Sequence, residues 1–117
     1  MTMNNNNQKY YTYMLRCTDN SLYTGITTDV KRRMTEHFSK NEKCAKYTKN
    51  HTAQKLEAVW ESADRTLACR LEYRIKQLTK AQKEALILHN SIEVMADKIN
   101  IDNYKRVNFD KDITLYP

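Results

Sequence analysis

The stretch YYTYMLRCTDNSLYTGI, residues 10–26, decides the fold of this chain. Residues 10–17 are mostly aromatic, β-branched or long and apolar, which favours a strand, and residues 22–26 have the same character. The four residues between them, Thr18 to Ser21, are all turn formers. We therefore predict a β-hairpin over residues 10–26, with Tyr13 on its first strand and Tyr23 on its second.

A helix, a loop and a third strand are expected after the hairpin. Residues 27–29 offer N-cap side chains, and apolar residues then recur at helical spacing over 30–38. Residues 39–53 are polar and lysine-rich without a period, which indicates a loop. Residues 55–61 alternate apolar and charged side chains, as a half-buried strand does. The expected inward positions are Val30, Met34 and Phe38 in the helix, and Leu56, Ala58 and Trp60 in the strand.

Two further helices complete the predicted domain. Ser62 or Asp64 can cap the first, whose apolar face consists of Leu67, Leu71, Ile75 and Leu78. Thr79 starts the second, with Gln82 in the capping-box position, and this helix runs to about Leu88. The order ββαβαα predicts an α+β fold over residues 10–88, a small three-stranded antiparallel sheet flanked by helices. We expect residues 1–9 to form a disordered polar leader. Residues 89–117 form a C-terminal extension that either packs on the domain or binds another chain.

The composition excludes several classes of protein. With a single glycine, Gly25, the chain has neither a phosphate-binding P-loop, nor a dinucleotide fingerprint, nor a G-x-S-x-G elbow. No apolar run is long enough to cross a bilayer, and the N-terminus lacks a secretory signal, so we expect a cytoplasmic protein. Cys17, Cys44 and Cys69 contain no CxxC pair, so neither a zinc site nor a redox motif is indicated. We expect reduced, structural cysteines, with a reactive thiol as the alternative.

Positive charge is concentrated in the first part of the chain. The net charge of the 117 residues is +6. Residues 1–50 hold nine Lys and Arg against four Asp and Glu, a balance of +5. Residues 51–92 hold seven against five, and residues 93–117 hold four against five. This asymmetry favours a surface that meets a polyanion such as nucleic acid.

Several polar residues border the apolar stripes of the predicted helices. Arg33 and His37 are at i and i+4 beside the first stripe, where a cation needs a partner, either a structural carboxylate or a substrate phosphate. Glu72 lies at the edge of the second stripe, where it either forms a salt bridge to Arg33 or binds a divalent metal beside a phosphate. Gly25, at the end of the second strand, indicates a turn, a bulge, a left-handed residue or a close approach by a ligand or by backbone.

In order along the chain, these residues resemble the signature of the GIY-YIG nucleases. The paired motifs are YTY at 11–13 and YTG at 23–25, followed by R-x-x-x-H from Arg33 to His37 and by Glu72 on a later helix. The likeness covers about residues 10–88 and is greatest to the short stand-alone bacterial members. Tyr11 stands where the first signature has a glycine. With no room for a separate DNA-recognition domain, substrate choice is expected to rest on this domain, its tail or another protein.

The resemblance implies a role for each matched residue. Tyr23 is the expected catalytic tyrosine and first candidate for the general base, and Tyr13 lines the site. Arg33 grips the scissile phosphate, and His37 is the second candidate for the base. Glu72 is the sole protein ligand of one divalent ion, Mg²⁺ or Mn²⁺. Gly25 lets backbone and substrate come close. Tyrosine phenols have a pKa near 10 and need nearby cations to act as bases, whereas histidine does not.

The expected function is metal-dependent endonucleolytic hydrolysis of phosphodiester bonds in DNA, in a structure-specific setting such as repair or recombination. The alternative is a non-catalytic nucleic-acid-binding module that keeps the scaffold. A third possibility is a protein partner bound through the C-terminal extension. In the lysine-rich loop, Lys46, Tyr47 and Thr48 are candidate substrate contacts, and a solvated basic loop is the other interpretation.

Overall fold

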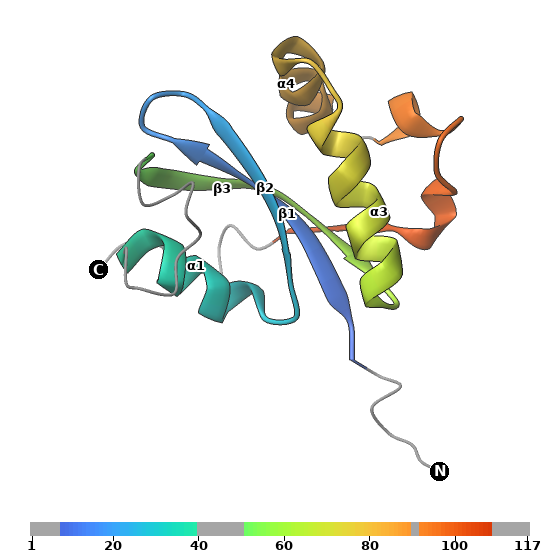
Figure 1. The fold of residues 1–117 in the computed structure, drawn as a ribbon, viewed down its shortest axis with the longest axis horizontal. Helices are drawn as coiled ribbons and strands as arrows, with labels where there is room; N and C mark the ends of the chain where they lie inside the picture. The colour runs from blue at the N-terminus through green and yellow to red at the C-terminus, as the bar shows by residue number, and fades with distance from the viewer. Residues whose placement is uncertain (1–7, 40–50, 90–91, 109–117) are drawn as a thin grey trace.

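A computed structural model describes residues 8–39, 51–89 and 92–108 of the chain. Its centre is a four-stranded antiparallel sheet in the order β2-β1-β3-β4, with helix α1 on one face and helices α3 and α4 on the other (Figure 1). The strands are β1 (Tyr10–Cys17), β2 (Leu22–Thr27), β3 (Ala53–Ser62) and β4 (Lys105–Val107). The helices are α1 (Val30–Ser39), α3 (Arg65–Lys76), α4 (Lys80–His89) and the 3₁₀ turns η2 (Glu93–Met95) and η3 (Ile101–Asn103).

The predicted hairpin forms with the expected strands. β1 and β2 pair antiparallel in a register that places Tyr13 opposite Gly25. In the turn, the backbone N–H of Asn20 donates to the carbonyl of Cys17 at 2.8 Å, and Asn20 has a φ of 70°. Asparagine tolerates this left-handed conformation better than most residues, which explains how the turn closes without a glycine.

Strand β3 is buried on both faces only at its centre, residues 58–60, so the predicted half-buried alternation fails there, whereas Gln54 and Lys55 are exposed. Ala58 and Trp60 pack into the core under α3 and α4, as their alternation predicts. Val59, between them, is equally buried and packs with Tyr13 and Met34 on the α1 side. At this level β4 pairs with β3 and apolar clusters cover both faces of the sheet, so Val59 has no solvent side.

Both predicted helix starts are confirmed by their capping bonds. The carboxylate of Asp64 accepts a hydrogen bond from the backbone N–H of Leu67 at 2.9 Å, so Asp64 is the N-cap of α3. At the start of α4, the Thr79 hydroxyl accepts from the Gln82 N–H at 3.1 Å, and the Gln82 side chain accepts from the Thr79 N–H at 2.9 Å. This reciprocal pair is the capping box that the sequence predicts.

The described part of the C-terminal extension packs against the domain and supplies a fourth strand. β4 pairs with β3 with Val107 opposite Val59, which corrects the expectation of three strands. Ile92 and Met95 are buried in the same core as Trp60. A strand of three residues is too short to show a period of two, which explains why the sequence pattern did not indicate it.

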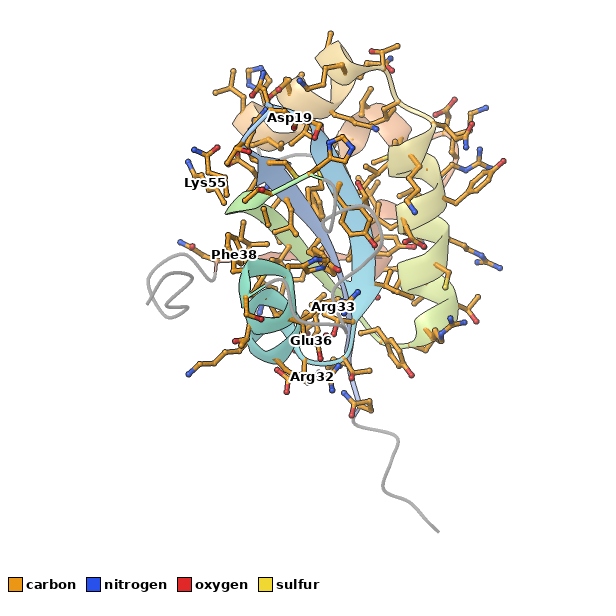
Figure 2. All side chains as sticks on the ribbon, turned by 60° about the vertical axis from the view of Figure 1, so that its left-hand side comes forward. Asp19, Arg32, Arg33, Glu36, Phe38 and Lys55 are labelled. Carbon is orange, nitrogen blue, oxygen red and sulfur yellow. The ribbon has the colours of Figure 1, made fainter. Side chains whose placement is uncertain are left out.

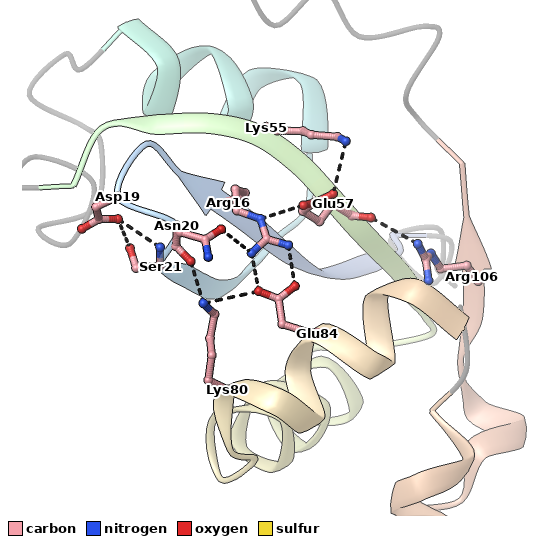
Figure 3. Close-up of polar contacts among 9 residues, drawn as sticks. All are labelled: Arg16, Asp19, Asn20, Ser21, Lys55, Glu57, Lys80, Glu84 and Arg106. Carbon is pink, nitrogen blue, oxygen red and sulfur yellow. Dashed lines mark hydrogen bonds and ion pairs between the residues drawn. The ribbon is translucent and has the colours of Figure 1, made fainter.

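Arg16 on β1 ties the sheet to helix α4 through a network of ion pairs (Figure 3). Its Nε donates to Glu57 on β3 at 2.8 Å and its Nη2 donates to Glu84 on α4 at 2.6 Å. Its Nη1 donates to the side chain of Asn20 at 3.0 Å and also to Glu84. Lys80 pairs with Glu84 at 3.3 Å. The hydrogen bonds from Arg16 lower the pKa of Glu84 to about 2.

Of the helices within the described ranges, none combines the length and the apolar character needed to cross a membrane. Cys17 and Cys69 are both free thiols. Cys44 lies outside the described residues, as does most of the predicted leader.

Candidate active site

A hydrogen bond between the hairpin and α1 forms the centre of the candidate site. Tyr13 projects from β1 toward α1, and its phenol oxygen lies 2.7 Å from Nε2 of His37. Both side chains are almost completely buried, at 1% and 0% exposure. His37 lies on the buried side of α1 with Val30 and Met34, where the helical period predicts Phe38; Phe38 is only partly buried. The buried face of α1 therefore includes a polar residue with a polar partner.

Gly25 makes room for this phenol. A Cβ atom at Gly25 would lie 2.6 Å from the Tyr13 Oη and 2.8 Å from its Cζ, distances that real Cβ atoms do not tolerate. The only glycine of the chain has no positive φ, so a left-handed conformation is not what requires it. The close approach expected from the sequence was that of a ligand or of backbone, whereas the group that approaches Gly25 here is the side chain of Tyr13. Aromatic rings often cover a cross-strand glycine in this way.

Tyr23 joins the pair to form a cluster of three rings. The ring centroids of Tyr23 and His37 lie 5.5 Å apart, and those of Tyr13 and His37 lie 5.6 Å apart. The two tyrosine rings are 6.2 Å apart. Tyr23 comes from β2, the edge strand, and is less buried than the other two rings. The cluster thus runs from the core to the edge of the sheet.

The environment keeps both members of the central hydrogen bond neutral. Burial lowers the pKa of His37 to about 4, and the nearby Arg33 guanidinium acts in the same direction. Burial and the neighbouring Tyr23 raise the pKa of Tyr13, while a hydrogen bond from Arg33 partly opposes them. From these two shifts we assign the proton of the bond to Tyr13, whose O–H donates to Nε2 of a neutral His37.

Arg33 is held on α1 by an acidic residue that the sequence analysis missed. The Arg33 Nη1 donates to Glu36 Oε1 at 2.5 Å, and Arg32 lies 3.8 Å from the same carboxylate. The three side chains lie along one side of α1 (Figure 2). The spacing i to i+3 between Arg33 and Glu36 was a visible signal for this pair. Arg33 is mostly buried, with 20% of its side chain exposed, whereas Arg32 is 55% exposed, as expected for a solvated side chain.

Glu72 approaches the ring cluster from α3, on the opposite side of β2. Its Oε2 lies 3.3 Å from Nζ of Lys76, and that Nζ lies 5.9 Å from the centre of the Tyr23 ring. The charge of Glu72 also contributes to raising the pKa of Tyr13. The ion pairs that the described residues form here run within each helix, and the alternative of a Glu72–Arg33 salt bridge is not among them. Sequence reasoning missed Lys76, although it is i+4 from Glu72.

The structure thus brings together five of the predicted residues and leaves three undescribed. Side chains from β1, β2, α1 and α3 meet here: Tyr13, Tyr23, Arg33, His37 and Glu72. Gly25 lies beneath them. The other predicted substrate contacts, Lys46, Tyr47 and Thr48, lie outside the described residues. No group of three or more His, Cys, Asp or Glu side chains in the described ranges is placed to enclose a metal ion.

Comparison with known proteins gives consistent matches. The family described as the GIY-YIG catalytic domain matches residues 9–85. A UPF0213 protein of Fusobacterium nucleatum is 49% identical over 78 residues, which are 67% of this chain and 76% of that protein. The UPF0213 protein YhbQ of Salmonella typhimurium is 50% identical over 78 residues, with the same shares of each chain. The solution NMR structure of a UPF0213 protein from Bacillus halodurans has 37% identity and a TM-score of 0.47, covering 77% of this chain and 94% of that one.

Proposed function

The chain belongs to the GIY-YIG superfamily, in its short single-domain form, and on this premise we propose that it is a metal-dependent endonuclease that hydrolyses phosphodiester bonds in DNA. The superfamily is one of nucleases, whereas the names of the matched relatives state no activity. The proposal therefore depends on the chemistry that the site of this chain offers.

The observation that carries the proposal is the convergence of four kinds of group on one edge of the sheet. Phenols, an imidazole, a guanidinium and a carboxylate come from β1, β2, α1 and α3. Phosphodiester hydrolysis needs a base for water, positive charge for the phosphate and a carboxylate able to hold a cation. A scaffold kept only for binding does not need a buried neutral histidine such as His37. Nor does it need a glycine at position 25, where any side chain would collide with the Tyr13 phenol.

Arg33 is the proposed phosphate ligand. Its guanidinium is presented at the partly exposed side of the cluster and is oriented by Glu36 at 2.5 Å and by Tyr13. A guanidinium held at two points has little freedom left to lose when a phosphate binds, and it neutralises charge that grows on the equatorial oxygens during hydrolysis.

Glu72 is the proposed metal ligand. Its side chain is 24% exposed, so its carboxylate is accessible from solvent beside the ring cluster. Mg²⁺ binds through one or two carboxylates together with water and substrate phosphate, which fits a site that offers one carboxylate. The bound ion would polarise the phosphate and stabilise the leaving 3′ oxygen. In the structure this carboxylate is paired with Lys76, and the ammonium group would add positive charge beside the bound ion.

The surroundings of His37 support Tyr23 as the general base. The Nε2 atom of His37 already accepts the hydrogen bond of Tyr13, and a pKa of about 4 makes the imidazole a weak base at neutral pH. We therefore assign His37 as a positioning residue, which holds the Tyr13 phenol and the rings around it. Tyr23, nearer the edge of the sheet and beside Lys76, remains the phenol placed to meet a water molecule.

The test is a cleavage assay on supercoiled plasmid and on branched DNA, with Mg²⁺, with Mn²⁺ and with EDTA. Glu72→Gln should lower the metal-dependent cleavage rate by about 100-fold or more, with an unchanged unfolding curve. Glu93→Gln, which neutralises an exposed glutamate on η2, is the matched control and should cleave like wild type. Arg33→Ala should behave like Glu72→Gln, and Arg32→Ala, one residue away on the exposed side of α1, should not.

Two outcomes would overturn the proposal. Wild type that binds DNA without cutting any substrate in either metal would support the non-catalytic alternative. Equal loss of activity in Glu72→Gln and Glu93→Gln would remove Glu72 from the site. Preference for branched over plasmid DNA would support a role in repair or recombination.

A further inference from the structure

A groove of about 560 Å³ lies between α3 and the C-terminal segment, away from the ring cluster. The two walls run side by side in Figure 1, where the part of the C-terminal segment before β4 lies beside α3. Tyr104 joins the walls, because its hydroxyl donates to the backbone carbonyl of Leu67 at 2.7 Å. Ile99 and Ile101 anchor the second wall to the core of the domain. The groove is therefore a built feature of the fold, formed by the extension.

The groove is lined by positive charge that the described residues neutralise only in part. Four cationic side chains face it, Arg65, Arg70, Arg74 and Lys98, and no acidic side chain is among its lining residues. Lys98 has a neighbouring carboxylate, Asp97, at 4.0 Å. Within the described ranges, the three arginines form no ion pair, whereas all three arginines before residue 34 do. Uncompensated arginines on one wall of a groove indicate an anionic ligand.

An exposed aromatic ring accompanies these arginines. Tyr73 is 57% exposed, which is unusual for a large aromatic side chain, and it lines the same groove. The guanidinium carbon of Arg74 lies 5.3 Å from the centre of the Tyr73 ring. An exposed ring with a guanidinium on its face provides a flat surface for stacking and a cation for phosphate, the combination used to bind single-stranded nucleic acid.

We propose that this groove binds the sugar-phosphate backbone of nucleic acid, with Arg65, Arg70 and Arg74 contacting phosphates of one strand and Tyr73 stacked on an unpaired base. That this nucleic acid is the substrate rests on the proposed nuclease function. Along α3, Arg65 and Arg74 are separated by about 13 Å at 1.5 Å per residue, the axial length of about four nucleotides of one DNA strand. Glu72 lies on the same helix, α3, but is not among the residues that line the groove.

The charge pattern favours nucleic acid over an acidic protein. Arginines spaced along a helix match a regularly charged backbone, and an exposed aromatic ring adds a contact that every base can satisfy. An acidic peptide would use the same arginines but would gain little from Tyr73. The proposal also gives the C-terminal extension a role, because its residues between 98 and 104 form the second wall of the groove beside α3.

The test measures binding of a labelled 20-nucleotide single strand, as DNA and as RNA, and of the matching duplex, all in EDTA so that no cleavage occurs. Arg70→Ala/Arg74→Ala should raise the dissociation constant for the single strand at least about 10-fold at 0.1 M salt. It should also flatten the slope of log affinity against log salt by about 1.4, the value for two lost phosphate contacts on a single strand. Lys55→Ala/Lys83→Ala, which removes two charges outside the groove, is the control and should keep the slope within 0.5 of wild type.

Variants of Tyr73 distinguish the contribution of base stacking to binding from that of charge. Tyr73→Ala should weaken single-strand binding about 10-fold and leave the salt slope unchanged, and Tyr73→Phe should restore binding. An equal effect of the groove double variant and the control double variant overturns the proposal. So does displacement of DNA by poly-glutamate at the same charge concentration as by unlabelled DNA, which would assign the groove to acidic protein.

The groove and the nuclease can fail separately. If wild type and Glu72→Gln both bind DNA through the groove but wild type does not cut, the nuclease proposal fails and the groove stands. If wild type cuts and the groove variant binds and cuts like wild type, the groove fails and the nuclease stands.

Discussion

Strand β1 carries two polar clusters, three residues apart, that differ in how their charges are balanced. Around Arg16, the guanidinium and its two carboxylates are all paired: Glu57 and Glu84 accept from the guanidinium, and a lysine flanks each carboxylate (Figure 3). Around Tyr13, the central bond joins two neutral groups, Tyr13 and His37, and the ion pairs beside them run within α1 and within α3. The first cluster connects β1 to β3 and α4, and the second connects it to β2 and α1.

The comparison indicates different uses: the charges around Arg16 stabilise the fold, whereas the polar groups around Tyr13 are available to a ligand. In the network around Arg16 the pKa of the Glu84 carboxyl is lowered, and the paired groups offer a ligand nothing to bind. In the other cluster, burial keeps Tyr13 and His37 neutral. Burying two polar side chains in this way lowers the stability of the fold, which indicates a role in binding or chemistry. Changes at Arg16 should therefore affect folding alone, and changes around Tyr13 should affect activity as well.

The largest expected effect is on folding, from Arg16→Ala. This change leaves Glu57 without its main partner at 11% side-chain exposure and removes the link to α4. We expect the free energy of unfolding to fall by about 3 kcal/mol, measured by urea denaturation. The cleavage rate of the protein that remains folded should be unchanged. Arg32→Ala, a control at an exposed position, should cost less than about 0.5 kcal/mol. A loss of activity per folded molecule in Arg16→Ala would erase the distinction between the two clusters.

Gly25→Ala should affect both quantities, because its added methyl group occupies the place of the Tyr13 phenol. With the Cβ 2.6 Å from the phenol oxygen, the ring must move and its bond to His37 must lengthen or break. We expect a loss of about 2 kcal/mol in unfolding free energy and at least about 10-fold in cleavage rate. Elsewhere in a strand, where the backbone permits it, Gly→Ala tends to be stabilising.

A second substitution tests this cause directly. In a Tyr13→Ala background the phenol is absent, so adding Gly25→Ala should cost little further stability. An equal cost in both backgrounds would show that the methyl group meets something other than Tyr13, and the close approach would lose its explanation.

The sequence predicts those features that depend on neighbouring residues. The hairpin, the caps at Asp64 and Thr79, and the location of Arg33 and His37 on one helix all follow from spacings of a few residues. The meeting of β2, α1 and α3 was expected from the resemblance alone, since no local pattern gives the distance between helices. The roles of the site residues stay predictions, although the structure places five of them together.

The features that the sequence did not predict depend on long-range contacts or on competition between partners. β4 forms by pairing with the edge of β3, and a segment of three residues is too short to show a strand pattern in the sequence. Val59 is buried because helices cover both faces of the sheet. Glu72 pairs with Lys76 because residues at i and i+4 are neighbours on any helix, whatever the rest of the fold does. The long-range salt bridge to Arg33, one of the two alternatives for Glu72, therefore competes with a partner that is closer in sequence.

The smallest effect expected is a dependence of stability on pH that belongs to His37. Its folded pKa of about 4 lies below the value near 6.5 of an unfolded histidine, so between these values the unfolded chain binds the extra proton. Stability from this residue is therefore complete above about pH 6.5 and is lost as the pH falls toward 4. Between pH 6.5 and pH 5, where Glu84 with its pKa of about 2 is still ionised, we expect a loss of about 1.5 kcal/mol in unfolding free energy.

His37→Gln should remove this slope while His89→Gln, at the exposed end of α4, keeps it. A slope that survives in His37→Gln would mean that another group titrates on unfolding, and the neutral Tyr13–His37 pair would no longer distinguish this cluster from that around Arg16.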